Sequence, residues 1–182
     1  MSFKSGHRII PLVFEEAEKV KEHFRGYRNG TIRLDPDGWF LTTHFITFAD
    51  KFFDFKFKRS DVVIMTYPKC GSTWVQEIVW NMLFNPNFDN PEASLPITIR
   101  SPFLDLDFIQ QNLPTNPNRP GSFLHDYFVR AHPNRNPNDG ISLQFAELAK
   151  DPRIIKTHLS FPLLSPSLPE ACKFSGALSG SI

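Results

Sequence analysis

The sequence has little cysteine, no long apolar run and almost no net charge. Its two cysteines, Cys70 and Cys172, are too few for the disulfide framework of a small secreted domain. No apolar stretch is long enough to cross a bilayer, and the N-terminus lacks the apolar core of a signal peptide. A formal net charge of +1 gives no reason to expect broad binding to nucleic acid or to a membrane surface. We therefore expect a cytoplasmic protein in a reducing compartment.

The composition is that of a folded domain. The chain has 182 residues, which suits one domain of ordinary size, and 41% of them are apolar, enough to bury a core. Its 19 phenylalanines predict an aromatic core or an aromatic-lined pocket, and a core is the more frequent outcome. We treat residues 1–182 as a single domain in which 174–182 form an atypical tail of small residues without a pattern.

Helical and strand patterns alternate along the chain. Apolar runs predict buried strands over 59–67 and 153–160, without the alternation of a half-exposed strand. We predict a turn over 34–40 and leave 43–58 unassigned, and the Pro- and Asn-rich stretch 112–140 predicts a long irregular loop. Helical spacing of apolar residues predicts helices over 12–25, 72–84, 101–111 and 142–152. This order favours an α/β domain with a parallel sheet flanked by helices.

The stretch "TYPKCGSTW" (66–74) lies between the first predicted strand and the helix over 72–84. The start of a helix presents free N–H groups and the positive end of the helix dipole. Gly71 permits close approach of an anion, Ser72 and Thr73 add hydroxyls, and Lys69 adds a positive charge. The stretch therefore predicts a phosphate-loop-like anion site, although Lys69 in a solvated turn and a hydroxyl that caps the helix would also fit.

Two other chemistries fit parts of this stretch. The lysine precedes the glycine, so the loop lacks the Walker A order, but a phosphotransferase with a variant loop stays open as an alternative. Cys70 at a helix start could be a nucleophile. The loop of cysteine phosphatases needs an arginine six positions later, where this chain has Gln76, so a packed thiol is the favoured interpretation.

Three segments resemble the cytosolic sulfotransferases. "TYPKCGSTW" is similar to the family's T-Y-P-K-[SC]-G-[ST]-T-W signature, and "DPRIIKTHLSFPLL" (151–164) is similar to its P-R-[IL]-[IL]-K-T-H-L-P segment. "SPFLDLD" (101–107) resembles the family's P-F-L-E element. The resemblance implies a sulfotransferase fold of the P-loop-like type. It also implies transfer of a sulfuryl group from 3′-phosphoadenosine 5′-phosphosulfate (PAPS) to a hydroxyl or amine, without a metal.

The resemblance also implies roles for individual residues. His158 would be the general base, Lys69 would stabilise the leaving bridging oxygen, and Lys156 would hold the sulfuryl oxygens. In an extended strand Lys156 and His158 lie two positions apart and face the same side, which suits this assignment. The cofactor loop would consist of Lys69, Cys70, Gly71, Ser72, Thr73 and Trp74.

The expected partner is a small-molecule acceptor: a phenol, alcohol, steroid or amine. The aromatic residues near 40–45, with Ile99, Phe103 and Phe108, could line an apolar acceptor pocket or belong to the core. The other histidines, His44, His125 and His132, are expected to be structural or on the surface, and the oligomeric state stays open.

The resemblance covers about the first three-fifths of the family's domain. The family's later segments include an arginine and a serine that bind the 3′-phosphate and a glycine-rich closing segment, and this sequence does not match them. The alternative function is therefore a truncated, inactive sulfotransferase-like product that binds the cofactor weakly or not at all.

Overall fold

The computed structural model describes residues 2–23, 30–109, 116 and 118–171. Cys172, the tail 174–182 and parts of three predicted segments (12–25, 101–111 and 112–140) lie outside the described residues.

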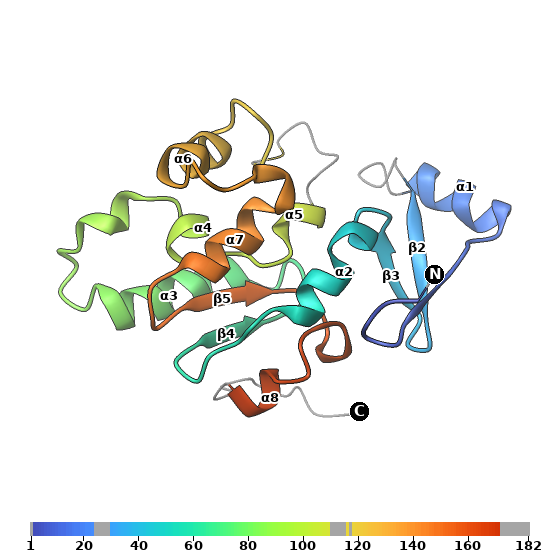
Figure 1. Ribbon diagram of the computed structural model, residues 1–182, viewed down its shortest axis with the longest axis horizontal. Helices are drawn as coiled ribbons and strands as arrows, with labels where there is room; N and C mark the ends of the chain where they lie inside the picture. The colour runs from blue at the N-terminus through green and yellow to red at the C-terminus, as the bar shows by residue number, and fades with distance from the viewer. Residues whose placement is uncertain (1, 24–29, 110–115, 117, 172–182) are drawn as a thin grey trace.

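Two small sheets form the framework (Figure 1). The first is antiparallel and contains β1 (Arg8–Ile10), β2 (Thr31–Asp35) and β3 (Trp39–Thr42) in that order. The predicted turn over 34–40 joins β2 to β3, and Gly38 takes the positive φ of 73° that this tight turn requires. The turn was predicted from the sequence, whereas the strands on either side of it were not.

The second sheet is parallel and pairs β4 (Val62–Met65) with β5 (Ile154–Thr157), with Val62 opposite Ile154. The other edge of β5 is covered by residues 102–104. The Lys156 N–H donates to the carbonyl of Pro102 at 2.9 Å, and the Leu104 N–H donates to the carbonyl of Lys156 at 2.8 Å. The predicted parallel sheet is thereby confirmed, and the carboxyl ends of β4 and β5 lie at the same edge.

Burial differs between the two parallel strands. All of β5 is buried, as expected for a strand with neighbours on both edges, whereas only Ile64 is buried in β4. The expectation that both faces of 59–67 are buried was therefore wrong for β4. Among the described residues, β4 has a strand neighbour on one edge only.

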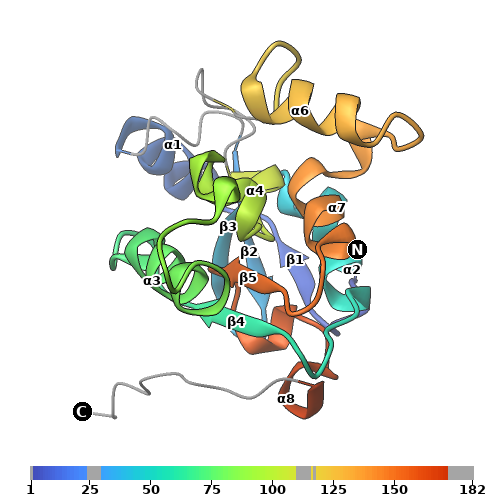
Figure 2. The same cartoon turned by 90° about the vertical axis from the view of Figure 1, so that its left-hand side faces the viewer.

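Helices lie on both sides of the β4–β5 pair. Figure 2 shows α3 (Ser72–Phe84) on one side and α2 (Phe45–Asp54) and α7 (Ile141–Leu148) on the other. The remaining helices among the described residues are α1 (Phe14–His23), α4 (Ile97–Arg100), α5 (Leu106–Ile109), α6 (Phe123–Ala131) and α8 (Leu168–Ala171), with 3-10 turns η2 (Pro91–Ser94), η3 (Pro137–Asp139) and η4 (Phe161–Leu163).

Local patterns predicted the long helices best. The helix over 72–84 is confirmed at both ends, and the one over 142–152 is found as α7, which stops before Asp151-Pro152. In the described part of 101–111 the helix starts only at Leu106, as α5, because residues 102–104 pair with β5. The irregular loop over 112–140 was wrong for 123–131, which form α6. The helix predicted over 12–25 exists as α1 but buries no residue.

The phenylalanine-rich composition builds the core around α2. The ring centroid of Phe45 lies 6.3 Å from that of Phe52 and 5.4 Å from that of Phe108, the latter in an edge-on arrangement. Phe48, Phe55 and Phe57 are buried beside them. Such aromatic pairs stabilise a core beyond the apolar area that they bury.

A buried ion pair fixes the starts of both parallel strands. The guanidinium of Arg153, directly before β5, donates to both carboxylate oxygens of Asp61, directly before β4, at 2.7 and 2.6 Å. The strands are therefore held in register at one end, and the loops at the other end start from fixed positions.

Candidate active site

The loop between β4 and α3 has the backbone of an anion site. Lys69 and Gly71 have positive φ values of 65° and 87°. Gly71 precedes the helix without a side-chain cap, and its carbonyl accepts from the N–H groups of Trp74 and Val75. The earlier N–H groups of the helix have no intrahelical acceptor, as at any helix start. A turn of this kind concentrates free donors and the positive end of the helix dipole.

One cavity, with a volume of about 790 Å³, brings most of the sequence-predicted residues together. The lining comes mainly from the loop after β4 with the start of α3, from the end of β5 and from the segment 103–109, with further residues from β3 and α4. Of the predicted site residues, it includes Lys69, Gly71, Ser72, Thr73, Trp74, Lys156 and His158. Cys70 is not part of this lining, and its thiol donates to the carbonyl of Tyr67 at 2.8 Å.

The imidazole of His158 packs edge-on against the ring of Phe103, and its Nδ1 faces Thr66, whose hydroxyl lies 3.4 Å away and whose carbonyl is nearer. Its Nδ1 lies 2.7 Å from the carbonyl oxygen of Thr66. A carbonyl oxygen only accepts, so Nδ1 carries the proton and Nε2 keeps its lone pair in the neutral ring. Burial lowers the pKa of His158, the hydrogen bond to Thr66 opposes this effect, and the charge of Lys156 adds to it. The ring is therefore neutral near pH 7, as a proton acceptor must be.

The buried ammonium group of Lys156 faces the same cavity. Its Nζ lies 4.3 Å from the ring centroid of Phe103, a cation–π contact. Burial lowers the pKa of Lys156, the charge of Asp105 raises it and that of Lys69 lowers it. Two lysines thus direct positive charge at one cavity, which suits an anion with several charges.

Asp105 is a site residue for which sequence reasoning assigned no role. Its side chain is fully buried, and both carboxylate oxygens accept from the backbone N–H of His158 at 3.1 Å. Burial raises the pKa of Asp105 to about 7, against the hydrogen bonds of Thr157 and His158 and the charge of Lys156. The motif "SPFLDLD" marked this position, but nothing in the sequence pointed to its contact with His158.

The rest of the cavity lining is mainly apolar. Of the residues that the sequence suggested for an acceptor pocket, the lining includes Phe40, Phe103 and Phe108. It does not include Ile99, and Phe45 lies in the core. The apolar lining outside the loop consists of Phe40, Leu41, Ile97, Phe103, Leu106, Phe108, Ile109 and Leu159.

The other three histidines discussed from the sequence do not line this cavity. His125 lies 3.1 Å from the carboxylate of Asp126, and His132 packs against the rings of Phe128 and Phe145. His44 precedes α2. The surface or structural roles expected for them agree with these positions.

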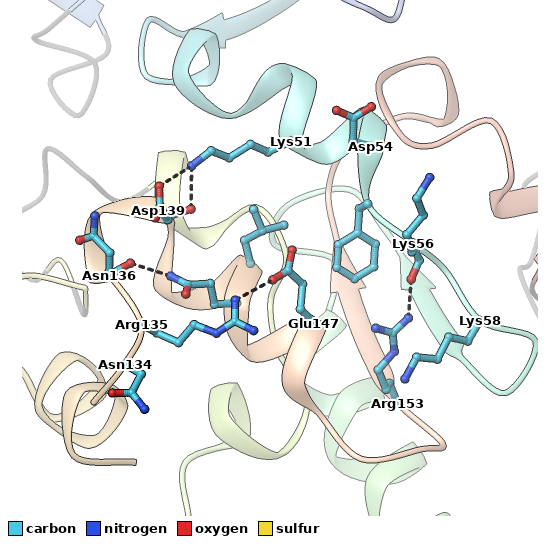
Figure 3. A pocket seen from close by; sticks show the side chains of 13 residues that line it. Lys51, Asp54, Lys56, Lys58, Asn134, Arg135, Asn136, Asp139, Glu147 and Arg153 are labelled. Carbon is cyan, nitrogen blue, oxygen red and sulfur yellow. Dashed lines mark hydrogen bonds and ion pairs between the residues drawn. The ribbon is translucent and has the colours of Figure 1, made fainter. Parts of the chain in front are cut away.

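A second cavity of about 730 Å³ lies beside α2, α7 and the start of β5 (Figure 3). Several of its charged side chains form ion pairs, within the lining or with residues outside it. Lys51 bonds Asp139 at 3.3 Å, Arg135 lies 3.9 Å from Glu147, and Arg153 is paired with Asp61. None of the sequence-predicted site residues lines it.

The described residues offer neither a candidate membrane span nor a candidate metal site. None of their helices combines the length and the apolar character needed to cross a membrane. They also contain no cluster of three or more His, Cys, Asp or Glu side chains able to hold a metal ion.

Comparison with known proteins identifies relatives of the matched region. The family model "Sulfotransferase domain" matches residues 59–174. Luciferin sulfotransferase of Photinus pyralis is 29% identical over 124 residues, covering 68% of this chain and 30% of that protein. Sulfotransferase 1C2 of Homo sapiens is 32% identical over 121 residues, covering 66% of this chain and 31% of that protein.

Solved structures show the same fold. Retinol dehydratase in complex with retinol and PAP superposes with a TM-score of 0.69 at 21% identity, over 92% of this chain and 50% of that chain. Retinol dehydratase with androsterone and the inactive cofactor PAP gives a TM-score of 0.67 at 24% identity, over 92% of this chain and 49% of that chain. The chain thus spans about half of these solved chains. The α/β sulfotransferase fold expected from the motifs is confirmed, and the chain belongs to the sulfotransferase domain family.

Proposed function

We propose that this protein takes part in sulfuryl transfer from PAPS to a hydroxyl or amine of a small acceptor. One observation carries the proposal. The loop after β4 and the residues that end β5 line the same cavity, which places Lys69, Lys156 and His158 around one space. Membership of the sulfotransferase domain family supports the same chemistry.

The residues around the loop fit a phosphosulfate group. Lys69, the start of α3 and two hydroxyl side chains form a donor set, and no atom lies within 4 Å of a Cβ built on Gly71. Lys69, Cys70, Gly71, Ser72 and Thr73 would form the loop around the 5′-phosphosulfate. Trp74 would contact the adenine, for which its 77% exposure leaves a ring face accessible. PAP in the two solved relatives supports this cofactor class.

Each proposed catalytic role is assigned to one side chain. PAPS supplies an activated sulfuryl group when bound. Nε2 of His158 accepts the acceptor's proton as the new bond to sulfur forms, because Nδ1 is already committed to Thr66. Lys69 stabilises charge on the oxygen that is released, and Lys156 stabilises charge on the sulfuryl oxygens.

The apolar part of the cavity suits a small acceptor that carries one reactive group on a largely apolar body. The solved relatives bind retinol and androsterone, and each of these molecules carries a reactive group on a largely apolar body. Phenols, alcohols, steroids and amines are the proposed acceptor classes. A cytoplasmic location is part of the proposal, supported by a relative named cytosolic sulfotransferase 1 from Danio rerio.

A second candidate is a sulfotransferase-like product that binds the cofactor weakly or not at all and has no turnover. The observation that favours it is the small parallel sheet, which in the described part of the chain consists of β4 and β5 with residues 102–104 alongside β5.

Radiolabelled transfer distinguishes the candidates. The purified chain is incubated with [35S]PAPS and a panel of phenols, alcohols, steroids and amines, beside Lys69→Met and a matched control, Lys51→Met, whose lysine lies in the other cavity. Transfer that is lost in Lys69→Met and kept in Lys51→Met supports the enzyme. PAP binding without any transfer supports the second candidate. Transfer that persists in Lys69→Met overturns the assignment of the loop.

A further inference from the structure

The strongest unexplained group in the cavity lining is the carboxylate of Asp105. An ionised carboxyl with 0% exposure is costly unless other groups compensate it. Its hydrogen-bond partners are the backbone N–H of His158 and the side chain of Thr157, and the nearby positive charge is Lys156. All three belong to the consecutive residues at the end of β5, so Asp105 holds one short piece of chain.

Asp105 is itself held rigidly against that piece. Residues 102–104 pair with β5 through two backbone hydrogen bonds of Lys156, whose N–H donates to Pro102 at 2.9 Å and whose carbonyl accepts from Leu104 at 2.8 Å. The next residue, Asp105, therefore lies just beyond the end of the ladder. There it meets the N–H of His158, the first residue after β5. The short segment 102–104 thus places one carboxylate beside the backbone of His158, in addition to contributing Phe103 to the cavity lining.

His158 has two anchors that come from opposite sides of β5. Asp105 holds its backbone N–H, and the carbonyl of Thr66, directly after β4, holds Nδ1 of its ring. A ring fixed at Nδ1 alone can still swing if the backbone moves, and a backbone fixed alone leaves the ring free to rotate. Both anchors together determine where Nε2 points.

We propose that Asp105 is a positioning residue for proton transfer, whose carboxylate fixes the backbone of His158 so that Nε2 faces the cavity. The inference rests on the proposed function, because it gives Asp105 a purpose only if His158 accepts a proton. The carboxylate does not contact the acceptor in this scheme. In its ionised form, Asp105 also favours the charged form of Lys156.

The neighbouring Asp107 provides a matched control. It lies two residues further along the same segment, is also buried, and also accepts backbone N–H groups, at 3.1 Å from Ser142 and 2.9 Å from Leu143. Those groups start α7, away from β5. Replacement of either aspartate costs buried hydrogen bonds, but only Asp105 touches His158.

The test uses the 15N-labelled full chain with the variants Asp105→Ala and Asp107→Ala. We expect the His158 amide proton of Asp105→Ala to exchange at least about tenfold faster than in wild type, the equivalent of one lost hydrogen bond. We also expect its imidazole to change from one tautomer, with the proton on Nδ1, to a mixture. In Asp107→Ala both signals stay at their wild-type values. Where Asp105→Ala does not fold, Asp105→Asn is used, with the same changes expected at a smaller size.

Turnover adds a second readout. In the transfer assay, Asp105→Ala is expected to lower kcat by about ten- to a hundredfold while the Kd for PAP stays within about twofold. Unchanged His158 amide and tautomer signals in the Asp105 variant, or equal changes in the Asp107 variant, overturn the positioning role. The signals of His158 are measured without turnover, so an inactive wild type contradicts the proposed function and leaves this geometric test intact.

Discussion

The buried ion pair between Arg153 and Asp61 gives the sharpest prediction about stability. The two side chains are 2% and 0% exposed. Every nitrogen of the guanidinium is used: Nε and Nη2 bond Asp61, Nη1 bonds the carbonyl of Ala146 at 2.9 Å, and Nη2 also bonds that of Lys56 at 2.8 Å. Arg153→Ala removes all of these contacts and leaves a carboxylate buried without its counter-charge.

The expected cost is about 3–5 kcal/mol of unfolding free energy, the usual effect of removing one partner of a buried pair. A domain of this size has about 5–15 kcal/mol in total, so the variant is close to unfolding. The double variant Asp61→Leu/Arg153→Met replaces both charges by apolar groups. This double variant should lose less unfolding free energy than Arg153→Ala alone, because no uncompensated charge stays buried.

Urea unfolding followed by circular dichroism and by the fluorescence of the buried Trp80 measures both variants. Reversing a surface pair, Lys58–Asp151, serves as the control, since both partners are about half exposed and such pairs contribute about 0–1 kcal/mol. A loss under about 1 kcal/mol in Arg153→Ala, or a double variant as unstable as the single one, would refute the reasoning.

Three further predictions concern the site and the fold around it. His158→Gln should lower sulfuryl transfer by about 10²–10⁴-fold with PAP affinity unchanged by calorimetry, and near-normal turnover would contradict the general base. The pH–rate profile should lose activity only below the ordinary histidine range, because the pKa of His158 is lowered and the base form persists to lower pH. An acid limb centred above pH 6.5 would contradict this prediction. Gly140→Ala should lower the melting temperature, since its Cβ would lie 2.8 Å from the Phe48 ring and 2.9 Å from Asp107 at a φ of 103°. An unchanged melting temperature would show that this contact relaxes freely.

The pH dependence of stability follows from two buried carboxyls. Burial raises the pKa of Asp105 to about 7 and that of Asp107 to about 6, against 3.8 for an ordinary aspartate. Each group binds its proton more tightly in the folded state, so folding is favoured at low pH and stability is lost as pH rises from about 4 to 7. Asp107→Asn should flatten part of this slope in melts recorded across that range, and an unchanged slope would contradict the assignment.

The loop after β4 and the strands β4 and β5 could be predicted from sequence, because each is specified by residues that lie close together in the chain. Lys69, Gly71 and Ser72 are adjacent in the chain, and the apolar runs on either side have lengths typical of a strand and a helix. Lys156 and His158 were placed on one side by strand geometry, and both line the cavity. In a continuous motif of this kind, the spacing along the chain determines how the side chains are arranged.

Contacts between distant segments could not be predicted in this way. The hydrogen bond of Asp105 to His158 spans 53 residues, and nothing in either segment specifies the other. The shortening of the predicted helix 101–111 has the same cause, since pairing with β5 overrides local helical spacing. The helix α6 was hidden because Pro and Asn on both sides made the whole region resemble a loop.

Calorimetric titration of PAP into the protein tests the central claim most directly, namely that the loop after β4 holds a phosphoadenosine cofactor. We expect measurable binding that Lys69→Met weakens at least about tenfold and Lys51→Met leaves unchanged, because only Lys69 lies at the start of α3. No binding by the wild-type chain, or equal affinity in wild type and Lys69→Met, would contradict it.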